Sequence, residues 1–113
     1  MYKIKKRLEI AGSHYLRLPY ESKCSSIHGH NWIIELEFKG MELNKSGMLI
    51  DFSDVKKIIN EKFDHKNLND IPSFTKINPT AENIAKYLFD YFPNCYRLTV
   101  IESENNTAIY EKD

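Results

Sequence analysis

Residues 28–39 read H-G-H-N-W-I-I-E-L-E-F-K, and this stretch decides how the chain is expected to fold. Ring-bearing or large apolar side chains occupy every even position from His28 to Phe38, and glycine or mostly polar residues occupy the odd positions. Such alternation is typical of a strand with one buried face, because successive side chains point to opposite sides. His28 and His30 are therefore expected to project from the same face of one strand.

Two further candidate metal ligands, His14 and Cys24, precede this strand. Imidazole and thiolate are the side chains that most often hold Zn²⁺. His28 and His30 can bind one ion together, and His14 from a neighbouring segment would supply a third ligand. Three histidines leave the fourth tetrahedral position open, as in catalytic zinc sites, whereas Cys24 as a fourth ligand would close a structural site. Both alternatives follow from the residues.

The composition indicates one soluble globular domain over residues 1–113, with 42% hydrophobic and 28% charged residues. Sixteen basic and sixteen acidic residues cancel, so charge gives no argument for a nucleic-acid partner. No apolar segment is long enough to span a membrane, and the basic start lacks the apolar core of a signal peptide. We therefore expect a cytoplasmic protein with neither a nucleic-acid nor a membrane partner.

The rest of the chain is expected to add three strands and two helices. Alternation predicts strands at 2–10, 96–102 and 107–111, and the last two would form a hairpin. Residues 48–50 are expected to be a short strand extension, and residues 66–79 a loop.

Helical spacing predicts one helix capped by Asp51 or Ser53 and ending near Asp64, and a second helix capped by Thr80 and closed by Pro93. The order ββααββ predicts an α+β fold, with a four-stranded antiparallel sheet and both helices on one face.

Three other positions carry candidate chemistry. Asp64 directly precedes His65, and a neighbouring carboxylate can orient an imidazole and make it a better base. A histidine at a helix C-terminus is also favoured by the helix dipole alone. Glu102 has the apolar parity of its strand, so its carboxylate needs a partner or a ligand unless it bends into solvent. Together with Cys24, these groups suggest acid–base chemistry on a small polar molecule.

Taken in order, these motifs resemble the 6-pyruvoyltetrahydropterin synthase / 6-carboxy-5,6,7,8-tetrahydropterin synthase family. The resemblance covers nearly the whole chain and rests on His14, C-x₃-H-G-H at Cys24 to His30, D-H-x-x-L-N at Asp64 to Asn69, P-T-x-E-N at Pro79 to Asn83, and E-S at Glu102. It implies a tunnelling fold, in which subunits join their sheets into a barrel as a homo-oligomer, a trimer or hexamer, with active sites between subunits.

The resemblance also implies roles for individual residues. By this resemblance, zinc is held by His14, His28 and His30. Cys24 would be the proton-abstracting base, assisted by His65 with Asp64 behind it. Glu102 would bind the guanidine-like edge of the pterin ring through a bidentate contact.

The branch of the family is suggested by the three residues between Cys24 and His28, since the pyruvoyl branch typically has five. The resemblance implies the 6-carboxytetrahydropterin synthase of the queuosine (7-deazaguanine) pathway, which converts 7,8-dihydroneopterin triphosphate to 6-carboxy-5,6,7,8-tetrahydropterin, acetaldehyde and triphosphate. The alternatives are a 6-pyruvoyltetrahydropterin synthase and a non-catalytic domain with a closed Cys-His₃ zinc site. A folate-type variant would place Glu near the Cys24 position, where Glu21 is the nearest carboxylate.

Overall fold

Two long antiparallel strands form the centre of the fold. The computed structural model describes residues 1–112 and pairs β1 (Tyr2–His14) with β2 (His28–Gly40) over their whole lengths, from Tyr2 opposite Gly40 to His14 opposite His28. β4 (Cys95–Ser103) pairs with β2, and β5 (Asn106–Glu111) pairs with β4, both antiparallel. The expected hairpin at the C-terminal end of the chain is confirmed.

The prediction of a four-stranded, purely antiparallel sheet is wrong. A fifth strand, β3 (Lys66–Asn67), runs parallel to β1 opposite Gly12 and Ser13, so the sheet is mixed, in the order β3-β1-β2-β4-β5. β3 lies in the segment predicted to be a loop, and it is followed by two 3₁₀-helices at Leu68–Asp70 and Pro72–Phe74. Two residues carry no alternation that a sequence pattern could reveal.

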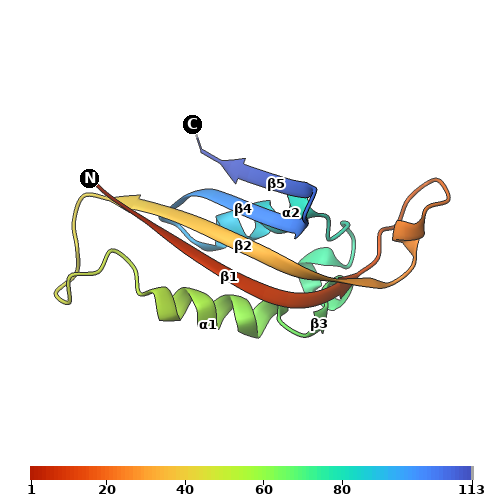
Figure 1. The fold of residues 1–113 in the computed structure, drawn as a ribbon, viewed down its shortest axis with the longest axis horizontal. Coiled ribbons are helices and arrows are strands. Elements are labelled where there is room, and N and C mark those ends of the chain that lie inside the picture. The colour runs from red at the N-terminus through yellow and green to blue at the C-terminus, as the bar shows by residue number, and fades with distance from the viewer. Residues whose placement is uncertain (113) are drawn as a thin grey trace.

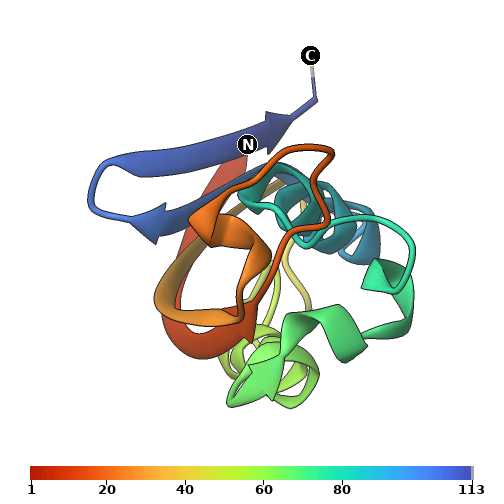
Figure 2. The ribbon, with the colours of Figure 1, turned by 90° about the vertical axis from the view of Figure 1, so that its right-hand side faces the viewer.

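Both predicted helices are present on one face of the sheet, which confirms the α+β class (Figure 1). α1 (Phe52–Phe63) begins after Asp51, whose side chain accepts a hydrogen bond from the Ser53 amide. α2 (Ala81–Tyr91) begins after Thr80, whose hydroxyl accepts from the Asn83 amide. Figure 2 shows both helices on the same side of the twisted sheet. None of the helices within residues 1–112 is long and apolar enough to cross a bilayer.

The core lies between this sheet face and the helices. The even positions of β2 supply much of it, and the helices contribute matching apolar stripes; its members include Trp32, Ile34, Leu36, Phe38, Val55, Ile59, Phe63, Ile84 and Leu88. Trp32 therefore continues the buried face that begins with His28 and His30. The metal-binding candidates lie at the end of this core.

The expected strand extension at residues 48–50 is also wrong. The side chain of Asn44 accepts hydrogen bonds from the amides of Ser46 and Met48 and closes a turn that ends at Met48. Gly47 has a positive φ of 80°, a conformation that favours glycine. This local hydrogen bonding replaces strand pairing in the segment.

Candidate metal and catalytic site

The three candidate metal ligands meet where β1 ends and β2 begins. His14 and His28 are register partners across the two strands, and His30 lies two residues further along β2 on the same face. One ring nitrogen from each of the three lies within 4.8 Å of the others. The antiparallel pairing thus joins His14 to the H-G-H motif, although the two are far apart in sequence.

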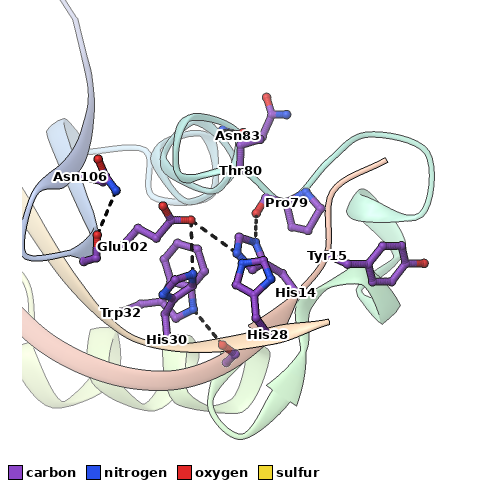
Figure 3. Close-up of polar contacts among 12 residues, drawn as sticks. His14, Tyr15, His28, His30, Trp32, Pro79, Thr80, Asn83, Glu102 and Asn106 are labelled. Atoms are coloured by element: carbon purple, nitrogen blue, oxygen red, sulfur yellow. Dashed lines mark hydrogen bonds and ion pairs between the residues drawn. The ribbon is translucent and has the colours of Figure 1, made fainter. Parts of the chain in front are cut away.

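Backbone carbonyls orient two of the rings. His14 Nδ1 lies 2.8 Å from the carbonyl oxygen of Pro79 (Figure 3). His28 Nδ1 lies 2.7 Å from the carbonyl oxygen of Ser26. A carbonyl can only accept, so each Nδ1 donates, and the Nε2 atom is left available as a ligand. The Nε2 atoms of His14 and His30 are buried and have no hydrogen-bond partner among the described residues. Such orphaned atoms match the donor set of a three-histidine metal site.

The electrostatics favour the neutral imidazoles that bind metal. Burial lowers the pKa of His14 below its ordinary value, although the hydrogen bond to Pro79 acts in the opposite direction. Burial likewise lowers the pKa of His30, against the attraction of Glu102. A metal ion binds deprotonated ligands, so both shifts prepare the rings for coordination.

Trp32 forms the apolar floor of the cluster, a role that the sequence argument missed. Its ring meets those of His14 and His30 edge-on, with centroids 4.9 and 5.1 Å away. Its Nε1 donates a hydrogen bond of 3.1 Å to the carbonyl of Gly12. The signal was present in the sequence, because Trp32 follows the two histidines at the same parity.

Cys24 and Glu102 line the same cleft as the histidines, a cavity of about 380 Å³. Cys24 is exposed on a 3₁₀-helix at Lys23–Ser25, within the long segment that projects beyond the sheet in Figure 1. Glu102 reaches in from β4, with Oε1 3.4 Å from His14 Nε2. Among residues 1–112, the group of potential ligands within 4.8 Å of one another contains the three histidines, and neither Cys24 nor Glu102 belongs to it. This geometry favours the open three-histidine site over the closed Cys-His₃ alternative.

Asp64 and His65 do not line the cleft that contains the three histidines. His65 has a φ of 58°, its amide donates to the carbonyl of Ala11, and its ring is 82% exposed. Asp64 Oδ1 accepts from the Ala11 amide, and its Oδ2 lies 3.7 Å from His65 Nε2. His65 lines a second cavity, together with parts of β1, β2 and β3. Within one chain, the structure does not bring this pair together with Cys24.

Asn69 was also missed as a positioning residue. Its amide group makes two hydrogen bonds to the backbone of Tyr15, accepting from the nitrogen at 2.8 Å and donating to the oxygen at 2.9 Å. Tyr15 directly follows His14, so Asn69 fixes the chain where it leaves β1. Asn69 belongs to the D-H-x-x-L-N motif, which was the signal that could have identified it.

Known proteins similar to this chain give a consistent result. The family model for 6-pyruvoyl tetrahydropterin synthase matches residues 3–113. A 6-pyruvoyl tetrahydrobiopterin synthase of Dictyostelium discoideum is 37% identical over 78% of this chain and 73% of its own length. A 6-carboxy-5,6,7,8-tetrahydropterin synthase of Bacillus subtilis is 28% identical over 96% of this chain and 84% of its own length. The structure of Caenorhabditis elegans 6-pyruvoyl tetrahydropterin synthase superimposes with a TM-score of 0.80 and 25% identity, over 99% of this chain and 96% of that one. The chain therefore belongs to the 6-pyruvoyl tetrahydropterin synthase family.

Proposed function

We propose that this protein is a zinc-dependent 6-carboxy-5,6,7,8-tetrahydropterin synthase of queuosine biosynthesis. It would convert 7,8-dihydroneopterin triphosphate to 6-carboxytetrahydropterin, with release of acetaldehyde and triphosphate. The observation that carries the proposal is the cleft in which three histidine nitrogens within 4.8 Å of one another lie beside Cys24 and Glu102.

The histidines would hold the zinc ion. Nδ1 atoms that donate to backbone carbonyls support this role for His14 and His28, and buried Nε2 atoms without a hydrogen-bond partner among the described residues support it for His14 and His30. A zinc ion bound there would polarise the side-chain hydroxyls of the substrate and make their protons easier to remove.

Cys24 would act as the base that removes a substrate proton. Cys24 is exposed and lines the cleft, so its sulfur can face a molecule bound there. His65, with Asp64 beside it, would pass protons in the same site from a neighbouring subunit, because in its own chain His65 lines another cavity.

Glu102 would hold the pterin ring. Another cleft, with a volume of about 540 Å³, lies between the start of α2 and the β4–β5 hairpin. Glu102 lines both this cleft and the one that contains the three histidines, called the histidine cleft below. A carboxylate at this junction can accept two hydrogen bonds from the guanidine-like edge of a pterin. The side chain of the substrate would then extend toward the histidines.

The product distinguishes the two branches. The three-residue spacing between Cys24 and His28 supports the carboxytetrahydropterin product. The 37% identity to a protein named 6-pyruvoyl tetrahydrobiopterin synthase supports the pyruvoyl product as the second candidate.

The test combines product and metal analysis on one sample. Purified protein is incubated with dihydroneopterin triphosphate, the pterin is identified by mass, and zinc per chain is measured. We expect the carboxylated pterin, acetaldehyde and about one zinc per chain. A pyruvoyl product would assign the other branch, and bound zinc without pterin turnover would overturn the proposed reaction.

Cys24→Ala should keep its zinc and lose turnover by at least about a hundredfold. Loss of zinc in this variant would instead make Cys24 a ligand.

A further inference from the structure

Glu102 lies at distances from two histidines that hydrogen bonding does not explain. Its Oε1 atom is 3.4 Å from Nε2 of His14 and 3.7 Å from Nε2 of His30. Neither nitrogen has a hydrogen-bond partner among the described residues. Normal hydrogen bonds between nitrogen and oxygen span about 2.7–3.2 Å, so the carboxylate approaches both rings without bonding to either.

The contact between Glu102 and His14 is electrostatically unfavourable unless a cation lies between them. His14 donates its Nδ1 proton to the carbonyl of Pro79, so in the neutral ring the Nε2 atom presents a lone pair. The Glu102 oxygen also presents lone pairs, and two acceptors facing one another repel. A metal ion between them turns this repulsion into attraction.

The distances from Glu102 to two of the three histidines match those between ligands of one tetrahedral ion. With metal–ligand bonds of about 2.0–2.2 Å, neighbouring ligand atoms of a tetrahedron are about 3.3–3.6 Å apart. The two observed separations, 3.4 and 3.7 Å, lie close to this range. We propose that Glu102 is the fourth ligand of the metal held by the three histidines while no substrate is bound. This inference rests on the metal site proposed above.

Glu102 would then couple binding of the pterin ring to the release of a coordination position on the metal. Its carboxylate lies in the wall shared by the histidine cleft and the cleft beside α2. One carboxylate cannot both coordinate the metal and hold the guanidine-like edge of a pterin with its two oxygens. Binding of the ring therefore removes Glu102 from the metal and frees the fourth position for the side chain of the substrate. Without a pterin, the metal stays closed to water.

Cobalt(II) is a suitable probe, because its visible absorption reports the ligands bound to it. Metal-free wild-type protein, Glu102→Gln and Glu102→Asp are titrated with Co²⁺, with Glu104→Gln as the control. Glu104 is an exposed carboxylate in the turn of the same hairpin. We expect both Glu102 variants to bind Co²⁺ at least about tenfold more weakly and to show altered spectra at saturation, and Glu104→Gln to match wild type. Glu102→Asp keeps the charge but withdraws the oxygen, so it separates coordination from simple attraction.

Unsubstituted pterin, which lacks the side-chain hydroxyls, tests the release step. Added to the cobalt-loaded wild type, it should shift the spectrum toward that of Glu102→Gln, and it should leave the Glu102→Gln spectrum unchanged. Identical saturated spectra for wild type and both Glu102 variants would overturn this inference and leave the three-histidine site intact. Failure of the wild type to bind Co²⁺ would overturn the metal site itself.

Discussion

Gly12 lies where β1 packs closely on the core, and its lack of a side chain permits this close contact. A Cβ atom at this position would lie 3.3 Å from Leu68 Cδ2 and 3.4 Å from Trp32 Nε1. Leu68 is fully buried and Trp32 contacts two of the clustered histidines. Close packing at Gly12 therefore supports the floor of the site.

Gly12→Ala is expected to destabilise the protein by about 1–2 kcal/mol, because Leu68 and Trp32 must move to admit the methyl group. Urea unfolding measures the loss, and the fluorescence of Trp32, the single tryptophan, reports the movement. Gly29→Ala is the control, since its Cβ would meet no atom nearer than 4.0 Å, the carbonyl oxygen of Gly12. Equal stability of the two variants would contradict the packing argument.

The strand that contains Gly12 shows a limit of the sequence argument. Alternation correctly placed His28 and His30 on one face, because local parity decides the direction of side chains within a strand. The alternation predicts a strand only over residues 2–10, and it leaves His14 in a neighbouring segment. β1 instead continues to His14 and is paired with β2 over its whole length. This pairing joins segments distant in sequence, which no local pattern reveals.

At the scale of elements, the cap of α2 is connected to the histidine cluster. Thr80 caps the helix, and the preceding residue, Pro79, accepts the hydrogen bond from His14 Nδ1. Asp51 caps α1 in the same way, but none of its hydrogen bonds within the described residues reaches the histidines. The two helix starts therefore form a matched pair.

Thr80→Ala and Asp51→Ala should each destabilise the protein by about 1 kcal/mol, because each leaves helix amides without an acceptor. Only Thr80→Ala should also weaken zinc binding several-fold, since loosening of Pro79 releases the ring of His14. Urea unfolding of the metal-free proteins and zinc competition with a chelator measure the two effects. If both variants bind zinc like wild type, the cap does not support the site.

The outer face of the sheet carries an ion-pair group in which Glu35 of β2 contacts Lys5 and Arg7 of β1. Burial tends to raise the pKa of Glu35, but the hydrogen bonds from Arg7 and Lys5 outweigh it, so this pKa lies below the ordinary value of a glutamate. A lowered pKa stabilises the folded state above the unfolded value. That stabilisation is lost as the pH falls through the folded value.

Glu35→Gln should therefore unfold more easily at neutral pH, by about 1 kcal/mol or less because both cations are more than half exposed. Its stability should also decline less than that of wild type between about pH 5 and pH 3. Urea unfolding across this range provides the measurement, with Glu104→Gln as the exposed control. Parallel pH curves for wild type and Glu35→Gln would show that the ion pairs contribute nothing.

At this scale the sequence was informative where periodicity and caps agreed. Asp51, Thr80 and the alternation in β2 and β4 predicted two helices and four strands close to their observed positions. β3 escaped because its pairing with Gly12 and Ser13 is a contact between distant segments. The strand predicted at residues 48–50 is absent, and its first amide, that of Met48, donates to the side chain of Asn44 instead of to a neighbouring strand.

At the scale of the whole molecule, the sheet has two open edges. Within residues 1–112, β5 pairs on one side only, and β1 is paired on its outer side only at Gly12 and Ser13. An open edge can pair with the sheet of another chain. If the subunits join their sheets into a closed barrel, these edges pair with one another and no open edge remains. We expect a trimer or hexamer in light scattering at micromolar concentration, and a monomer would contradict the shared-edge argument.

A shared active site makes a sharper prediction than assembly alone. The proposed reaction uses Cys24 and His65 together, but they line different cavities of one chain, so we infer that each site takes Cys24 from one subunit and His65 from another. Cys24→Ala and His65→Ala should each be inactive as pure oligomers. Unfolded together in equal amounts and refolded, they should regain about a quarter of the wild-type activity, because each site then draws both intact residues from two randomly chosen chains. Each variant refolded alone is the control. A mixture as inactive as its parents would mean that each site draws both groups from one chain, and would contradict the shared site.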